Sequence, residues 1–189
     1  MLFAHGGGSS RHSPRNQSVA GVLHGVGMRT VLIDLLTERE EREDHQTHEL
    51  RFDIDLLSER VGEAISWLRG QPELAGDPIG VFGASTGAAA ALVAAADLPG
   101  DISAVVSRGG RPDLAGDALT RVKAPTLLIV GGNESVVERL NREAMTRMTA
   151  ETRLEIVPGA FHLFEEPGAL DQVARLAADW FRTRLSGEQ

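Results

Sequence analysis

The sequence has no cysteine and no tyrosine, and aromatic residues make up only 4% of its 189 residues. Without cysteine, disulfides, thiolate-bound zinc and a cysteine nucleophile are excluded, and the redox compartment stays open. So few aromatic side chains argue against a stacking platform for bases or sugars. Uninterrupted apolar runs stay well short of the roughly 18 residues that a transmembrane helix needs, so no membrane span is expected.

Charge and the first residues narrow the function classes further. The formal net charge of −8 argues against nucleic acid or an anionic membrane as the main partner. The opening residues MLFAHGGG lack the basic-then-apolar pattern of a signal peptide, so a cytoplasmic location is expected. Length and a 42% share of hydrophobic residues predict that residues 1–189 form one domain.

Short apolar runs alternate with segments of helical period, which is typical of βα units on a parallel sheet. The runs are 2–4, 30–36, 78–82, 102–107, 125–131 and 153–158. Because they are almost continuously hydrophobic, helices should cover both faces of the sheet. The pattern predicts a three-layer α/β fold with about six mostly parallel strands.

Capping residues and apolar spacing predict four helices. Ser13 can cap a helix that begins at Pro14, and apolar residues recur at three- and four-residue steps across 52–69. Ser135 and Glu138 have the spacing of a capping box. The expected buried faces include Val19, Val22, Leu23 and Val26 in the first helix, Val136, Leu140, Ala144 and Met148 in the third, and Leu170, Val173, Ala177, Trp180 and Phe181 in the last, which opens at Pro167.

Two segments lack a clear period. Residues 37–51 are highly charged without an apolar stripe, so we expect a solvated loop or an exposed helical turn, with a mobile rim over an active site as the alternative. Residues 108–124 are expected to wrap over one end of the sheet. They are the only segment with room for a cap, and that cap would be small.

Ser85 lies in a G-x-S-x-G motif between an apolar strand and an alanine-rich helix. In this context the motif indicates a nucleophile elbow, in which a strained turn holds the serine hydroxyl clear of the backbone. The start of the following helix can supply N–H groups and a positive dipole to a developing oxyanion. The alternative is a tight packing turn without chemistry.

A glycine-rich loop, His5-Gly6-Gly7-Gly8, follows the first strand. An HGGG loop after a strand matches the oxyanion-hole loop of many esterases. The expected donors are the backbone N–H of Thr86 and that of Gly7 or Gly8. A simple turn is the alternative, whereas a P-loop is excluded because no Lys-Ser/Thr pair follows.

A base and an acid are expected at the carboxyl ends of later strands, where an open α/β sheet gathers its active site. His162 follows the run 153–158, and Glu134 follows the run 125–131. The chain order Ser85, Glu134, His162 is the serine–acid–histidine order of α/β-hydrolases. Each residue alone could have a purely structural or solvent-exposed role, but the order and placement of the three together predict a catalytic triad.

Other candidates are weaker. Asp113 and Asp117 are the rivals of Glu134 for the acid, and His12 is expected to shape the HGGG loop rather than act as the base. The nearest approach to a metal-binding pattern is Asp44-His45-x-x-His48, inside the charged segment, so no metal site is expected.

Five stretches together resemble the small, lidless α/β-hydrolases of the dienelactone-hydrolase-like group: FAHGGGSSRHSPRN, GASTGAAAAL, SRGGRPDL, PTLLIVGG and VPGAFHLFEEPG. Some relatives in that group are fused to phosphoribosyltransferase domains. The resemblance implies Ser85 as nucleophile, His162 as general base and a carboxylate at Glu134. It also implies that Arg11, His12, Arg15 and Asn16 shape the oxyanion loop and the start of the first helix.

The sequence departs from that group in three ways. Dienelactone hydrolases use a cysteine nucleophile, so Ser85 favours simple ester hydrolysis, and the usual aspartate is replaced by the longer Glu134. The fold normally has two strands before the HGGG loop, and these are expected to be missing. Strand 30–36 would then be an edge strand, which we expect to pair with another chain in a homodimer or to be shielded by 37–51.

The predicted function is a serine carboxylesterase that cleaves short-chain esters of small molecules through an acyl-enzyme, without a cofactor. Two alternatives use the same fold. One is a catalytically weak or inert binding or scaffold protein, and the other is a lactone or dienelactone hydrolase or an acyltransferase with the same triad.

Overall fold

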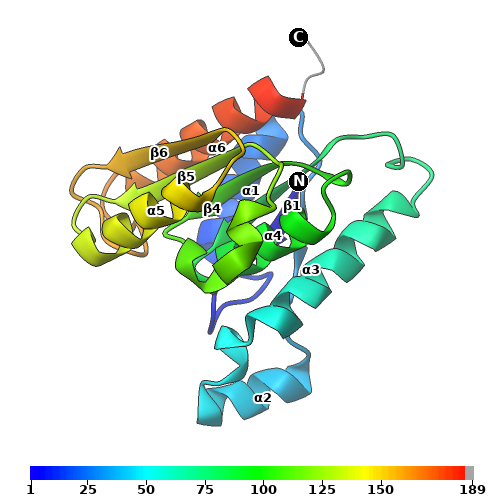
Figure 1. Cartoon of the computed structure of the whole chain (residues 1–189), viewed down its shortest axis with the longest axis horizontal. Helices are drawn as coiled ribbons and strands as arrows, with labels where there is room; N and C mark the ends of the chain where they lie inside the picture. The colour runs from blue at the N-terminus through cyan, green and yellow to red at the C-terminus, as the bar shows by residue number, and fades with distance from the viewer. Residues whose placement is uncertain (186–189) are drawn as a thin grey trace.

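The computed structural model describes residues 1–185, which form a six-stranded parallel sheet between two layers of helices (Figure 1). The strand order is β2-β1-β3-β4-β5-β6. The strands are β1 Leu2–Ala4, β2 Val31–Ile33, β3 Ile79–Ala84, β4 Ile102–Arg108, β5 Thr126–Gly131 and β6 Thr152–Val157. All six coincide with the predicted apolar runs, so the three-layer α/β-hydrolase architecture is confirmed.

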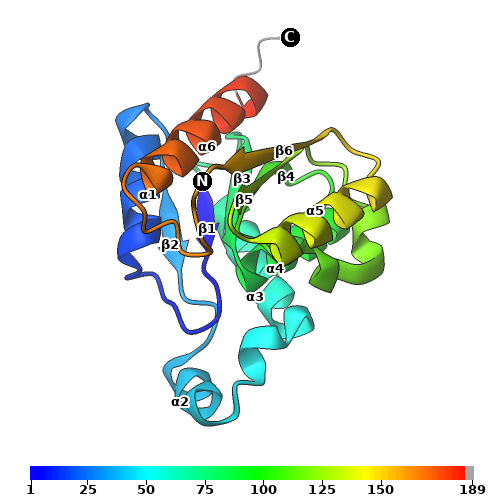
Figure 2. The same ribbon diagram turned by 90° about the vertical axis from the view of Figure 1, so that its left-hand side faces the viewer.

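Each face of the sheet carries its own helices (Figures 1 and 2). One face packs against α1 (Pro14–Gly25) and α6 (Ala169–Leu185). The other packs against α3 (Ile54–Arg69), α4 (Thr86–Asp97) and α5 (Ser135–Arg147). Two hydrophobic clusters therefore fill the molecule. Ala88–Ala91 of α4 are fully buried and present only methyl groups, so this helix can pack closely on the strands.

The first helix begins as predicted, but its buried stripe is narrower than expected. The Asn16 N–H donates to the Ser13 hydroxyl at 3.4 Å, and Pro14 is the first helical residue. Val22 is 37% exposed and Val26 is 52% exposed, so the prediction that both are buried was wrong. Because α1 covers the edge of the sheet beside α6, only its central stripe meets the core.

The predicted capping box of α5 is wrong. The N-cap is Glu134, one residue earlier than expected, and it makes no side-chain capping bond. The Glu134 carboxylate is bonded elsewhere, to His162, so the helix starts at Ser135 without a capping side chain. Val136, expected on the buried face, is 60% exposed, whereas Asn141 and Ala144 are buried.

The charged segment 37–51 contains a regular exposed helix, α2 (Glu38–Thr47), followed by the short helix η1 (Leu50–Phe52). Thr37 and Glu40 form a capping box at its start. Helix α2 projects from one end of the molecule (Figures 1 and 2). Exposure thus matches the expectation, although the segment is a capped helix rather than a loop.

Residues 108–124 do not form a cap, which corrects the prediction for this segment. They contain the short helix η2 (Pro112–Thr120), which packs beside α4 and α5. Ala115, Ala118 and Leu119 are buried in the core cluster on that side of the sheet. Because these apolar side chains are buried in the core, the segment lies along the helical layer instead of over the strand ends.

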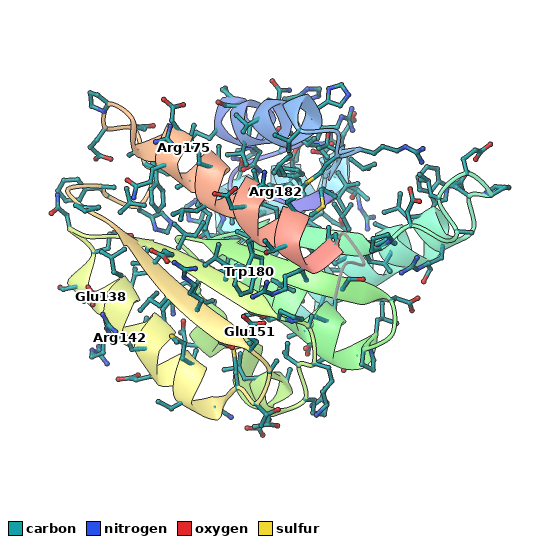
Figure 3. All side chains as sticks on the ribbon, turned by 90° about the horizontal axis from the view of Figure 1, so that it is seen from above. Glu138, Arg142, Glu151, Arg175, Trp180 and Arg182 are labelled. Atoms are coloured by element: carbon teal, nitrogen blue, oxygen red, sulfur yellow. The ribbon has the colours of Figure 1, made fainter. Side chains whose placement is uncertain are left out.

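The two margins of the sheet differ. At one, β2 is an edge strand as predicted, but it spans only three residues, all half-buried. At the other, Arg184 of α6 pairs with Glu151 and stacks 4.5 Å above the Trp180 ring. Figure 3 labels Glu151 and Trp180. Within residues 1–185, no helix combines the length and apolarity needed to cross a bilayer.

Candidate active site

Ser85 occupies the turn between β3 and α4 in a strained backbone conformation. Its φ of 52° and ψ of −120° lie in a region that residues other than glycine rarely adopt. Three backbone bonds hold it there: its N–H donates to the Arg108 carbonyl at 3.2 Å, and its carbonyl accepts from Ala88 at 3.1 Å and Arg111 at 3.2 Å. A turn fixed in this way is a common device for presenting a nucleophile.

The glycines on either side of Ser85 allow the turn to pack tightly. A Cβ at Gly83 would lie 2.5 Å from the Ala88 Cα, and a Cβ at Gly87 would lie 2.3 Å from the His5 carbonyl oxygen. No side chain fits at either position. As a result, the first turn of α4 sits against β1 and β3 with its free N–H groups and positive dipole beside Ser85.

The HGGG loop lies against the turn that carries Ser85. A Cβ at Gly6 would lie 2.8 Å from the Ser85 Cβ. The Gly7 N–H donates to the Thr86 hydroxyl at 3.2 Å. Of the two expected loop donors, Gly7 therefore lies beside Thr86, whereas Gly8, with φ of 70°, lies toward the Arg51 guanidinium.

His5 connects this loop to the end of β2. Its Nδ1 lies 2.8 Å from the Gly6 carbonyl, and its Nε2 accepts the Leu35 N–H at 2.9 Å. These partners require a proton on Nδ1 and an acceptor at Nε2. His5 is buried and both ring nitrogens are occupied, so it positions the loop.

The other residues expected to shape the site lie along the same loop. Arg11 binds Asp34 twice, through its backbone N–H at 2.7 Å and its guanidinium at 2.6 Å. His12 is exposed, and its backbone N–H donates to the Ser10 hydroxyl. Both line the cavity beside the loop.

Glu134 and His162 come together at the ends of β5 and β6. His162 Nδ1 lies 2.9 Å from Glu134 Oε2, and both side chains are partly buried. The loops that carry them are joined by backbone bonds from Gly132 to Val157 at 2.8 Å and from Asn133 to Ala160 at 3.0 Å. Their relative position is thus set by the backbone of two adjacent loops.

Ser85 and His162 border the same turn after β4. Arg108 accepts the Ser85 N–H, and the next residue, Gly109, lies so close to the His162 ring that a Cβ there would be 3.3 Å from Nδ1. Among the hydrogen bonds of residues 1–185, none joins Ser85 Oγ to His162 Nε2. Catalytic contacts of this kind are often long in a free enzyme and shorten when substrate binds.

The rival acids have other partners. Asp113 accepts two hydrogen bonds from the Arg111 guanidinium, at 2.9 and 2.8 Å. Asp117 pairs with Arg147 at 2.7 Å, and its side chain is 98% exposed. Neither carboxylate bonds His162.

A cavity of about 510 Å³ opens beside the HGGG loop. Its walls are the HGGG loop, the start of α1, the end of β2, Thr86 and the charged segment with α2. Residues of 37–51 therefore line the cavity and those of 108–124 do not, while Ser85, Glu134 and His162 lie outside its lining.

Arg51 is a residue of that lining that the sequence did not single out. Its aliphatic stem packs on the HGGG loop, where a Cβ at Gly7 would lie 2.8 Å from the Arg51 Cβ. Asp44 holds it through the Arg51 N–H at 2.9 Å and Nε at 2.7 Å. Burial alone would raise the pKa of Asp44, but the bonds from Arg51 outweigh it and lower that pKa.

The Asp44-His45-x-x-His48 pattern does not assemble a metal site. Asp44 is occupied by Arg51, and His48 ends α2 in a left-handed conformation. Among the 185 residues that the structure describes, no group of three carboxylates and imidazoles is arranged to hold a metal ion.

Comparisons with known proteins concern the family and the fold. The model of the dienelactone hydrolase family matches residues 28–185. A crystal structure of a dienelactone hydrolase from Anabaena variabilis is 57% identical, with a TM-score of 0.95, and the match covers 97% of this chain and 85% of that one. A monoacylglycerol lipase from Paleococcus ferrophilus, 15% identical with a TM-score of 0.73 over 97% of this chain and 93% of its own, shares the fold.

Two curated proteins from strains of Mycobacterium tuberculosis, each named "Putative phosphoribosyl transferase", are 58% identical over 187 residues. The match covers 99% of this chain but only 41% of each relative. This chain thus corresponds to about two fifths of those longer proteins.

Proposed function

Since this chain belongs to the dienelactone hydrolase family, we propose that it is a serine hydrolase that cleaves short-chain carboxylic esters through an acyl-enzyme on Ser85. One observation carries the proposal. A serine with φ of 52° at the start of α4 lies beside the same turn as a histidine whose Nδ1 is 2.9 Å from a carboxylate. A strained serine near an oriented base is the starting arrangement for nucleophilic catalysis, in which the base comes within hydrogen-bond reach of the nucleophile.

In the proposed mechanism, Ser85 Oγ attacks the ester carbonyl while His162 Nε2 accepts its proton. Glu134 keeps the proton of the imidazole on Nδ1 and stabilises the imidazolium that forms. His162 then protonates the leaving alcohol. A water molecule, deprotonated by the same histidine, attacks the acyl-enzyme and releases the carboxylic acid.

The oxyanion of each tetrahedral intermediate would be bound by the Thr86 N–H and the Gly7 N–H. The Gly7 N–H lies next to the nucleophile turn, where it donates to the Thr86 hydroxyl at 3.2 Å, and it would exchange this bond for one to the oxyanion. The dipole of α4 adds to the stabilisation. Removing one such donor typically costs about 10²- to 10³-fold in kcat.

The adjoining cavity supports small, polar substrates. The cavity has a volume of about 510 Å³. Much of its lining consists of charged side chains, which come from the segment after the HGGG loop, from α2 and from Arg51. A long lipid chain would lie against these charges as well as against the apolar residues Leu35, Leu36 and Leu57.

The proposal is tested by the release of p-nitrophenol from its acetate and butyrate esters. Wild type should hydrolyse both esters, and Ser85→Ala should lose the activity. Equal rates in the two proteins would remove the esterase assignment.

An inert binding protein of the same fold is the second candidate, and one observation favours it: Ser85 Oγ makes no hydrogen bond to His162 within residues 1–185. Lactone or dienelactone opening and acyl transfer would use the same residues as ester hydrolysis. The phosphoribosyl transferase name belongs to relatives more than twice as long as this chain.

We also propose that the chain forms a homodimer through β2. This edge strand pairs with β1 on one side only, which leaves backbone donors and acceptors on its other side. Sedimentation analysis over a range of concentrations tests it, and a protein that stays monomeric at high concentration would contradict it.

A further inference from the structure

Asn141, in the middle of α5, is a polar residue at a position that suits an apolar one. Its exposed fraction is 0%, and its Oδ1 has no hydrogen-bond partner. A buried polar atom without a partner is costly, and asparagine is a poor helix former. Ala144, three residues later, is buried on the same helix, so this side of α5 accepts a simple methyl group. The presence of an amide here calls for an explanation other than the stability of the helix.

The amide nitrogen of Asn141 reaches the turn that follows β4, residues 109–111. Its Nδ2 donates to the Gly110 carbonyl at 3.1 Å. It also donates to the Val137 carbonyl of its own helix, at 2.8 Å. The second bond fixes the orientation of the amide, and the first joins α5 to the turn.

The bond from Asn141 acts on one end of a rigid peptide group, and Ser85 holds the other end. The Gly110 carbonyl and the Arg111 N–H belong to the same planar, trans peptide, so they point in opposite directions. The Arg111 N–H donates to the Ser85 carbonyl at 3.2 Å. Because the direction of that carbonyl depends on the ψ of Ser85, the peptide helps to keep Ser85 in its strained conformation.

The residue before this peptide borders the proposed base. Gly109 donates its N–H to the Ile129 carbonyl of β5 at 2.7 Å. A Cβ at Gly109 would lie 3.3 Å from Nδ1 of His162. The turn 109–111 thus contacts the nucleophile at one end and the base at the other. A shift of this turn would change the distance between Ser85 and His162, which must come within hydrogen-bond reach for proton transfer.

Close packing surrounds Gly110 on the sides that α5 does not cover. A Cβ at Gly110 would lie 1.9 Å from the Ser107 Oγ of β4 and 2.7 Å from the Ala88 Cβ of α4. The amide of Asn141 is the contact from the third direction. Truncating it would take the donor from a buried carbonyl and free one side of the turn.

We propose that Asn141 is a positioning residue, which holds the Gly110–Arg111 peptide and so sets the place of Ser85 relative to His162. The inference rests on the proposed function and adds a residue to its machinery. Helix α5 then supports the site at two points. Glu134 at its N-cap bonds His162, and Asn141, about two turns later, holds the turn beside Ser85.

The test compares Asn141→Ala with Thr126→Ala. Both truncate a fully buried side chain that donates to a backbone carbonyl, but Thr126 lies at the start of β5, away from the strand ends that carry the site. Both variants should have a lower Tm than wild type. With p-nitrophenyl acetate, well below Tm, Asn141→Ala should lower kcat about 10- to 100-fold and leave KM within about twofold, because misplaced reacting groups slow the reaction more than they weaken binding. Equal kcat values in the two variants would overturn the positioning role.

A second variant and a double mutant make the test independent of packing. Asn141→Asp keeps the size of the side chain but sets an acceptor against the Gly110 carbonyl, so kcat should fall at least as far as in Asn141→Ala. In a His162→Ala background no base is left to align, and Asn141→Ala should then cause little further loss of kcat/KM. An undiminished loss in that background would assign Asn141 to folding alone.

A measurement without substrate separates this inference from the proposed function. The NMR resonance of the His162 Cε1–H, assigned by its absence in His162→Gln, reports the surroundings of the ring. At fixed pH it should shift in Asn141→Ala and stay in place in Thr126→Ala. If wild type cleaves no ester and the resonance shifts as expected, the proposed function fails and the positioning of the turn stands. If wild type is active and Asn141→Ala changes neither kcat nor the resonance, the positioning role alone fails.

Discussion

His162 Nδ1 lies 2.9 Å from Glu134 Oε2, and the two residues come from adjacent loops whose backbones are bonded to one another. The arrangement accommodates the extra methylene of a glutamate, because Glu134 stands at the N-cap of α5, directly after the β5 loop. Its carboxylate reaches the imidazole where a capping bond would otherwise be expected. Because the Glu134 carboxylate bonds His162, it orients the imidazole and leaves the start of α5 without a side-chain capping bond.

Replacing Glu134 by glutamine should lower kcat for p-nitrophenyl butyrate by about 10²-fold or more, because the imidazolium loses its counter-charge and its preferred tautomer. KM should change little. The matched variant is Asp113→Asn, which removes a carboxylate bound to Arg111 instead. A large loss in Asp113→Asn with a small one in Glu134→Gln would reassign the acid.

Gly109→Ala should lower both stability and kcat. The residue has φ of 51°, and a Cβ would lie 3.3 Å from His162 Nδ1. Gly116→Ala is the control, since Gly116 has φ of 53° with no atom within 4 Å of the added Cβ. Both should lose about 1–2 kcal/mol of unfolding free energy from backbone strain. Only Gly109→Ala should also slow turnover, and equal kcat values in the two would argue against His162 as the base.

Gly87→Ala should destabilise the fold strongly, because its Cβ would lie 2.3 Å from the His5 carbonyl and force α4 away from β1. We expect a loss of about 1–3 kcal/mol or more in urea unfolding. At Gly100 the added Cβ has no atom within 4 Å, so Gly100→Ala should stay within about 0.5 kcal/mol of wild type. Similar stability in the two variants would contradict the tight turn.

Asp44→Asn should destabilise the protein at neutral pH by about 1–3 kcal/mol, since it breaks the charged bonds to Arg51. The pKa of Asp44 is lowered in the folded state, so its contribution is complete above its unfolded pKa and is lost as the pH falls through the folded value. The difference between wild type and Asp44→Asn should therefore shrink below about pH 4.

The control for Asp44 is Glu38→Gln on the same helix, whose carboxylate is 94% exposed and lies 4.0 Å from Arg42. Its effect should stay within about 0.5 kcal/mol at every pH. A difference for Asp44→Asn that does not depend on pH would contradict the ionised pair.

Strong local patterns predicted most of the fold. The six apolar runs became the six strands, and Ser13 and Pro14 marked the start of α1. The burial of residues at the borders of a helix's apolar stripe was less predictable. Val22 and Val136 fit a helical period, yet both are exposed, because α1 and α5 each cover only part of a face of the sheet. Periodicity identifies the apolar side of a helix, but tertiary packing decides how wide the buried stripe is.

For the candidate site, chain order predicted that Glu134 and His162 would meet, because adjacent parallel strands end at the same edge. Arg51 and Asn141 were missed. Arg51 stands in a charged stretch with no apolar stripe, and only its contact with Gly7 reveals it. Asn141 lies in a helix whose period was recognised, but nothing in that period shows that its amide reaches the turn after β4.

The central claim is that Ser85 is an activated nucleophile, and covalent labelling tests it most directly. Wild type and Ser85→Ala are incubated with a fluorophosphonate probe, which bonds to an activated serine oxygen with loss of fluoride, and the adduct is located by peptide mass spectrometry. We predict one adduct, on Ser85, that appears in step with the loss of p-nitrophenyl butyrate hydrolysis. An unlabelled wild type, or equal labelling of Ser85→Ala, would contradict the claim.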